Sequence, residues 1–131
     1  MLAESAPAQR LHGLAPVYAN SARWLLLGSF PGEASLRAQQ YYGHPQNQFW
    51  RLLGAVLGED LQALGYAQRL DRLRARQVAV WDVIATTVRA GSLDSAIRAP
   101  EGSDLLGLMA QLPELEVVAF NGGAAAKLGR K

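Results

Sequence analysis

Three short apolar runs constrain the fold of this chain more than any other feature of its sequence. They cover residues 24–27, 78–81 and 117–120, and a glycine or a polar residue follows each of them at once. Strands that are apolar on both faces are typical of parallel sheets covered by helices on both sides. The three runs therefore predict strands of one parallel sheet.

Helical periodicity fills the intervals between these runs. The predicted helices cover residues 49–57, 61–76 and 103–112. Asn47 is a plausible N-cap for the first of them, and Ser103 or Asp104 for the last, while Gly58 and Gly65 are weak points. Strands that alternate with helices predict right-handed crossovers and a three-layer α/β/α fold with a central, mostly parallel sheet. We expect residues 1–131 to form a single domain.

The composition limits the chemistry that is available. The 131 residues are half apolar and include no cysteine, so disulfides, a thiolate nucleophile and cysteine-bound metal clusters are excluded. No apolar run approaches the ~20 residues of a membrane-spanning helix, and we expect a cytoplasmic protein. Eleven of the thirteen basic residues are arginine, whose planar guanidinium suits phosphate groups. A net charge of +2 allows nucleic-acid binding without indicating it.

The carboxyl ends of the predicted strands locate a site. Ligands of open α/β sheets bind beyond these ends, so we expect segments 28–32, 82–89 and 121–123 to form one site. The first is a Gly-Ser-Phe-Pro-Gly turn, and by itself it is an ordinary strand-to-helix turn. More informative is the loop 41–50, Tyr-Tyr-Gly-His-Pro-Gln-Asn-Gln-Phe-Trp, because its aromatic rings can stack on bases and its amides can read base edges.

These two segments, in this order, resemble motifs of the uracil-DNA glycosylase superfamily. The turn 28–32, Ser35 and the loop 41–50 are closest to the hypoxanthine-DNA glycosylases, and they also resemble the mismatch-specific uracil glycosylases. The likeness continues through residues 80–84 and 91–97 to Phe120-Asn121-Gly122. The resemblance implies the α/β/α fold and hydrolysis of the N-glycosidic bond of a deaminated base flipped out of double-stranded DNA. It implies no cofactor and no metal, and we expect a monomer.

Catalytic roles follow from the matched positions. Asn47 is the residue that we expect to position the water or the departing base, although capping of its helix is an alternative and both roles are compatible. Many relatives carry Asn or Asp in the turn where this chain has Ser29 and Phe30. We therefore expect more of the catalysis to depend on Asn47, while Ser29 and Phe30 stay candidate catalytic positions. The backbone amides of Phe30 and Gly32 are candidate contributors, and Gly32 is also expected to contact the base.

The other matched residues are expected to bind the base and the DNA. Tyr42 resembles the aromatic that stacks on the flipped base, with packing inside the loop as the alternative. Asp82 is expected to accept the ring N–H of the base, with turn capping or pairing with Arg89 as equal alternatives. His44 is expected to fix the loop beside the base. The residues expected to contact DNA are Ser35, Arg89, Asn121 and Gly122.

Relatives in the resembling family continue beyond the Asn-Gly segment into a helix, another strand and a DNA-gripping loop. This chain ends at Lys131, inside the expected helix 123–131, so we expect it to lack that last strand. Two other interpretations stay open. One is a catalytically silent, truncated protein with the same fold, and the other is a small nucleotide- or anion-binding module built on the turn 28–32. Neither common glycine-rich phosphate fingerprint is present to support the second.

Overall fold

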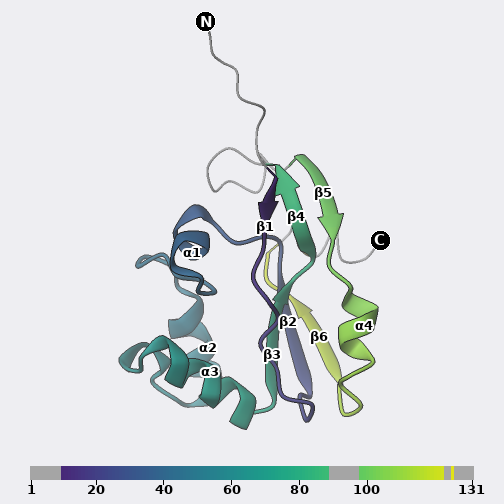
Figure 1. The fold of residues 1–131 in the computed structure, drawn as a ribbon. Helices are drawn as coiled ribbons and strands as arrows, with labels where there is room; N and C mark the ends of the chain where they lie inside the picture. Colours follow the sequence, from purple (N-terminus) through teal and green to yellow (C-terminus); the bar gives the residue numbers. More distant parts are fainter. Residues whose placement is uncertain (1–9, 89–97, 123–124, 126–131) are drawn as a thin grey trace, which may run out of the picture.

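The structure is a computed structural model that describes residues 10–88, 98–122 and Ala125. Its elements follow the chain in the order β1 (Leu11–His12), β2 (Trp24–Gly28), α1 (Glu33–Ala38), α2 (Phe49–Leu57), η1 (Leu61–Ala63), α3 (Tyr66–Ala75), β3 (Val78–Asp82), β4 (Ile84–Val88), β5 (Arg98–Gly102), α4 (Leu105–Met109) and β6 (Val117–Phe120). The helices α1, α2 and α3 lie on one side of the strands and α4 lies on the other (Figure 1).

The predicted parallel sheet is confirmed. Its strand order is β3-β2-β6, and β2 is parallel to both neighbours. The register pairs Gly28 with Asp82 and Leu27 with Phe120 at the carboxyl end of the sheet. Within the described residues β6 is an edge strand of this sheet.

Both faces of β2 are covered, which explains its uninterrupted apolar sequence. Leu25 and Leu27 are fully buried in a cluster with Leu108 and Leu112 on the α4 side. Leu26 packs on the opposite side, in the cluster centred on residues of α2, α3 and β3. The apolar run 24–27 indicated a buried strand throughout, but 48% of Trp24 is exposed at the first position of β2. Trp50 at the start of α2, by contrast, is buried.

A second, antiparallel sheet was not predicted. It has the order β1-β4-β5, and β4 begins only one residue after β3 ends. Segment 82–89 was expected to be a site loop, but most of it forms this strand, and only its first residue ends the parallel sheet. Threonines 86 and 87 gave β4 a weaker apolar pattern than the three parallel strands have, which is why the sequence did not reveal it.

The predicted helices are present with different bounds. Helix α2 covers 49–57 as expected and ends at Gly58, whose positive φ of 72° suits the left-handed C-cap. The predicted helix 61–76 is divided into η1 and α3, with a break before Gly65. Helix α4 has the expected Asp104 side-chain cap but ends at Met109, not at Leu112. The expected helix 123–131 lies outside the described residues, apart from Ala125.

Candidate active site

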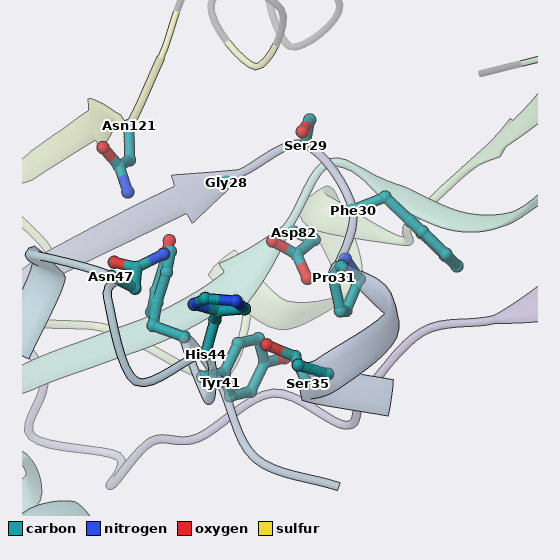
Figure 2. Close-up of a pocket in the computed structure, with 13 residues that line it drawn as sticks. Gly28, Ser29, Phe30, Pro31, Ser35, Tyr41, His44, Asn47, Asp82 and Asn121 are labelled. Carbon is teal, nitrogen blue, oxygen red and sulfur yellow. The ribbon is translucent and has the colours of Figure 1, made fainter. Parts of the chain in front are cut away.

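A pocket of about 350 Å³ opens at the carboxyl end of the parallel sheet (Figure 2). It is large enough for a small planar ligand. The residues that line it are Gly28, Ser29, Phe30, Pro31, Gly32, Ala34, Ser35, Tyr41, Tyr42, His44, Asn47, Asp82 and Asn121. They come from the ends of β2, β3 and β6, from α1, and from the loop before α2. The turn 28–32 and the loop before α2 therefore meet in one pocket, and of the predicted segments 82–89 and 121–123 only Asp82 and Asn121 line it.

Asp82 lies in the floor of this pocket. The residue is only 5% exposed, and its backbone carbonyl accepts a hydrogen bond from the Ser103 hydroxyl at 2.6 Å. The next residue, Val83, donates its N–H to the carbonyl of Gly28 at 2.8 Å. These main-chain contacts fix the end of β3 against the turn that follows β2. Pairing of Asp82 with Arg89 cannot be described, because Arg89 lies outside the described residues.

The first turn contributes its main chain more than its side chains. Ser29 is buried, and its carbonyl accepts a hydrogen bond from Ile84 N–H at 3.1 Å. Phe30 lines the pocket, but its ring belongs to the core on the α4 side and points away from the centre of the pocket (Figure 2). The Gly32 carbonyl accepts the first helical hydrogen bond of α1, from Leu36. This turn is therefore a rigid, main-chain wall of the site.

The two adjacent tyrosines have different environments. The buried Tyr41 hydroxyl donates to the carbonyls of Leu14 and Ala15, at 3.1 and 2.8 Å, and its burial raises its pKa well above the usual range. Tyr42 has a positive φ of 52° and stacks on Phe49, with ring centroids 3.7 Å apart and planes inclined by 17°. Tyr41 thus anchors the loop, and Tyr42 is a flat wall of the pocket.

The Tyr42 hydroxyl is buried, and among the described residues it forms no hydrogen bond of ordinary geometry. Burial is the main reason that the pKa of this hydroxyl is raised to about 12. The side chain of Asn121 acts in the opposite direction, and the negative charge of Asp82 adds to the rise. The hydroxyl is therefore protonated at neutral pH and available as a donor.

Asn47 lies in the mouth of the pocket, just before α2. Its Oδ1 atom accepts a hydrogen bond from the N–H of Phe49 at 2.8 Å, so the expected capping contact is present although Gln48 occupies the N-cap position. Its own N–H donates to the His44 carbonyl at 2.9 Å. The nitrogen of the Asn47 side chain, Nδ2, points into the pocket (Figure 2).

Contacts within the loop determine the places of His44 and Ser35. The Nδ1 atom of His44 accepts a hydrogen bond from Gln46 N–H at 3.1 Å, which fits the expectation that this histidine fixes the loop. Ser35 is buried, and its hydroxyl accepts the N–H of Gly43 at 2.9 Å. Ser35 thereby ties α1 to the loop that carries Tyr42.

Two of the residues expected to contact DNA lie at the end of β6. Asn121 lines the pocket and donates its backbone N–H to the Leu27 carbonyl at 2.7 Å. Gly122 follows it with a φ of 101° and does not line the pocket. The sequence interpretation missed Phe49, whose ring supports Tyr42 from behind. An aromatic pair at the start of an amphipathic helix looks like core, and no local signal distinguishes a ring that supports a site.

Within the described residues, no cluster of histidine and acidic side chains could hold a metal ion. No described helix has the length and apolar character needed to cross a bilayer. The site consists of an aromatic wall, a buried carboxylate, two carboxamide side chains and the main chain of the turn 28–32. That set of groups suits a polar, planar ring that is stacked on one face and hydrogen-bonded along its edge.

Comparisons with known proteins identify the family. The model of the uracil DNA glycosylase superfamily matches residues 15–131. A hypoxanthine DNA glycosylase of Methanosarcina barkeri is 44% identical over 110 residues, covering 84% of this chain and 70% of the relative. A hypoxanthine DNA glycosylase of Methanosarcina acetivorans is 41% identical over 115 residues, covering 88% of this chain and 73% of the relative.

A solved structure agrees with this assignment. It is an NMR structure of a candidate uracil DNA glycosylase from Methanosarcina acetivorans, with a TM-score of 0.84 and 38% sequence identity. The match covers 93% of this chain and 76% of that one. The fold and pocket define an α/β protein with a pocket at the carboxyl end of its parallel sheet. The chain belongs to the uracil DNA glycosylase superfamily.

Proposed function

We propose that this protein removes a deaminated base from double-stranded DNA by hydrolysing its N-glycosidic bond, with hypoxanthine preferred to uracil. The observation that carries the proposal is the convergence of Tyr42, Asp82 and Asn47 on one pocket. Two relatives at 44% and 41% identity are named hypoxanthine DNA glycosylases, which supports the reaction and the preferred base. The turn at Ser29 and Phe30 has neither Asn nor Asp, and this also favours hypoxanthine.

In this proposal the base enters the pocket after it has left the duplex, at a cost of a few kcal/mol. The exposed face of Tyr42 stacks on the base, and such a contact is worth ~1–3 kcal/mol. The buried carboxylate of Asp82 accepts the ring N–H that both hypoxanthine and uracil carry. An ionised acceptor forms a hydrogen bond roughly twice as strong as a neutral one.

Bond cleavage leaves an oxocarbenium-like sugar and an anionic base. Asn47 is the residue proposed to stabilise this charge or to position the attacking water. The backbone amides of Phe30 and Gly32 are proposed to stabilise the same negative charge. His44 holds the loop, which keeps Asn47 in place. Groups fixed before the reaction lower the barrier because they need no reorganisation during it.

Contacts to DNA are proposed for the rim of the pocket. Asn121 and Gly122 at the end of β6 are candidates for binding the sugar–phosphate backbone. Arg89 and Ser35 remain predicted DNA contacts, and for Ser35 the bond to Gly43 supports an additional role in holding the loop. We also propose that the protein acts as a single-domain monomer in the cytoplasm.

A single-turnover assay tests the proposal. Duplexes that carry one hypoxanthine, uracil or xanthine are incubated with excess protein, and base release is measured as strand scission after alkali. We expect release of hypoxanthine to be fastest and an undamaged duplex to stay intact. Asp82→Asn should reduce the rate by about tenfold, because a charge-assisted bond exceeds a neutral one by about 1–1.5 kcal/mol.

The alternatives give different results in the same assay. Duplex binding without base release would indicate a catalytically silent protein and would overturn the proposal. Neither binding nor release, together with affinity for a mononucleotide or phosphate, would support the small anion-binding module. Efficient release of uracil with none of hypoxanthine would reverse the proposed preference.

A further inference from the structure

Phe49 does not line the pocket, yet it contacts two residues that do. Its ring stacks on Tyr42 with 3.7 Å between the ring centroids. Its main-chain N–H donates to Oδ1 of Asn47 at 2.8 Å. One residue behind the site is therefore in contact with both the aromatic wall and the carboxamide at the mouth.

The stack determines which face of Tyr42 a base can use. Phe49 covers one face of the Tyr42 ring almost in parallel, so a base can stack only on the other face. Tyr42 also adopts a positive φ, which is uncommon for a residue other than glycine and persists only where the surroundings hold it. The Phe49 ring is one of the contacts that hold it.

Phe49 is itself held firmly. Its ring meets Trp50 edge to face, with centroids 5.1 Å apart and planes at 82°. Trp50 is buried, and its indole N–H donates to the Tyr41 carbonyl at 3.1 Å. The guanidinium of Arg69 lies 5.4 Å from the centre of the Trp50 ring. Tyr66 of α3 also meets Trp50 edge to face, with ring centroids 6.1 Å apart. Phe49 thus belongs to a packed aromatic row that runs from α3 to Tyr42 in the wall of the pocket.

The hydrogen bond from the N–H of Phe49 determines which end of the Asn47 carboxamide faces the pocket. A main-chain N–H needs an acceptor, so the oxygen of the carboxamide must lie toward Phe49. The nitrogen then lies toward the interior of the pocket, as Figure 2 shows. Within the described ranges this NH₂ group donates to no other residue. Asn47 therefore presents hydrogen-bond donors to whatever occupies the pocket.

We propose that Phe49 is a positioning residue, which supports the stacking ring of Tyr42 with its own ring and, with its N–H, turns Asn47 to face the flipped base as a donor. This inference rests on the proposed function. It assigns to Asn47 the stabilisation of the departing base, since a donor strengthens its interaction as negative charge develops on that base. The geometry disfavours the other proposed role of Asn47, in which its carboxamide oxygen would accept a hydrogen bond from the attacking water, because that oxygen lies toward Phe49.

The test uses single-turnover cleavage of a hypoxanthine duplex at increasing protein concentration. This yields a half-saturating concentration and a rate constant at saturation. Phe49→Leu removes the ring but keeps the N–H, so we expect about a tenfold higher half-saturating concentration and a smaller change in the rate constant. Phe49→Tyr restores a ring and should restore affinity. Leu57→Ala, which shortens an apolar side chain at the far end of α2, controls for general loosening of that helix.

Asn47→Asp tests the orientation of the carboxamide. A carboxylate can still accept the N–H of Phe49, but its second oxygen now faces the base and cannot donate. We expect the rate constant to fall ~100-fold at neutral pH, the size of the loss of one preorganised donor. It should recover as the pH is lowered, because a protonated carboxyl donates again. The wild-type protein should lack this recovery.

The outcomes separate the inference from the proposed function. Wild-type affinity and rate in Phe49→Leu would overturn the role of the ring. Undiminished or faster cleavage by Asn47→Asp at neutral pH would show that Asn47 acts as an acceptor, which would overturn the role of the N–H. Absence of base release by the wild-type protein would overturn the proposed function itself. Circular dichroism and melting of each variant identify any that fail to fold, and Phe49→Met, which also lacks the ring and keeps the N–H, then serves in place of Phe49→Leu.

Discussion

The carboxylate of Asp82 lies in the space that a β-carbon would occupy at Gly28, its register partner on the neighbouring strand. A β-carbon at position 28 would lie 2.6 Å from Oδ1 of Asp82 and 3.0 Å from the hydroxyl of Tyr42. Position 28 therefore has room for hydrogen alone while both side chains keep their places. The glycine at the end of β2 permits the close approach of two groups that we assign to base binding.

Gly28→Ala should therefore impair the site more than the fold. The added methyl group must displace Asp82 or Tyr42, and a displacement of about 1 Å in an active site can cost ~100-fold in rate. We expect a 10- to 100-fold lower single-turnover rate, with little change in the far-ultraviolet circular dichroism. Gly102→Ala is the matched control, since the nearest atom to its new β-carbon would be 3.7 Å away. Equal single-turnover rates in Gly28→Ala and Gly102→Ala would show that the close packing at Gly28 does not affect activity.

Asn47→Ala separates a catalytic role from helix capping. If the amide acts on the base or on water, the chemical step should slow by ~100-fold or more, while DNA affinity changes much less. Loss of the bond to Phe49 N–H should in addition cost ~1 kcal/mol of stability. Single-turnover kinetics and urea unfolding measure the two effects independently. A loss of stability with unchanged cleavage would leave only the capping role.

The two adjacent tyrosines should respond in opposite ways to loss of the hydroxyl. Tyr41→Phe leaves the carbonyls of Leu14 and Ala15 without their donor, and we expect a loss of ~1–3 kcal/mol in the free energy of unfolding. Tyr42→Phe removes a buried hydroxyl that forms no hydrogen bond of ordinary geometry among the described residues, so stability should stay equal or rise slightly. Urea denaturation of both variants gives the comparison. A larger loss of stability in Tyr42→Phe than in Tyr41→Phe would contradict the contacts described for the two hydroxyls.

Glu59 should make part of the stability depend on pH. Its carboxylate forms two hydrogen bonds with Arg72, at 2.6 and 3.1 Å, and lies 3.5 Å from Arg76. The hydrogen bond to Arg72 is the main reason that the pKa of Glu59 is lowered. A lowered folded-state pKa gives a stabilisation that is present above the unfolded-state pKa and is lost as the pH falls through the folded-state pKa.

Glu59→Gln should accordingly lower the melting temperature slightly at pH 7, and its difference from the wild-type protein should shrink as the pH falls below about 4. Asp71→Asn is a suitable control, because Asp71 pairs with Arg74 in a position where its side chain is 77% exposed. We expect little effect from that substitution at any pH. A Glu59→Gln difference that stays constant down to pH 3 would contradict the ion pair as its cause.

The parallel sheet and its site could be predicted because each depends on local patterns. Continuous apolar strands specify burial on both faces, and parallel strands place their carboxyl ends together, so Asp82 and Asn121 had to meet near the turn after β2. The antiparallel sheet could not be predicted in the same way. Strand β4 follows β3 after a single residue, and its Thr86 and Thr87 interrupt the apolar pattern.

Long-range contacts explain what else the sequence did not show. The apolar character of Trp24 predicted burial, but the sequence does not reveal how much of the first position of a strand its neighbours cover. The sequence could not show the hydrogen bond between Gly43 and Ser35, because it depends on how α1 and the next loop fold against each other. The role of Phe49 depends on the positive φ of Tyr42, a conformation that the residue type alone does not predict.

The single residue between β3 and β4 has a consequence for how this protein can change in length. Val83 is the entire connection between β3 and β4, and its N–H and that of Ile84 donate to the carbonyls of Gly28 and Ser29 at the end of β2. Since side chains alternate along a strand, one inserted residue would turn the side chains of β4 to opposite faces or rotate Asp82 out of the floor. We therefore expect an insertion or a deletion at this joint to disrupt the pocket floor or the antiparallel sheet.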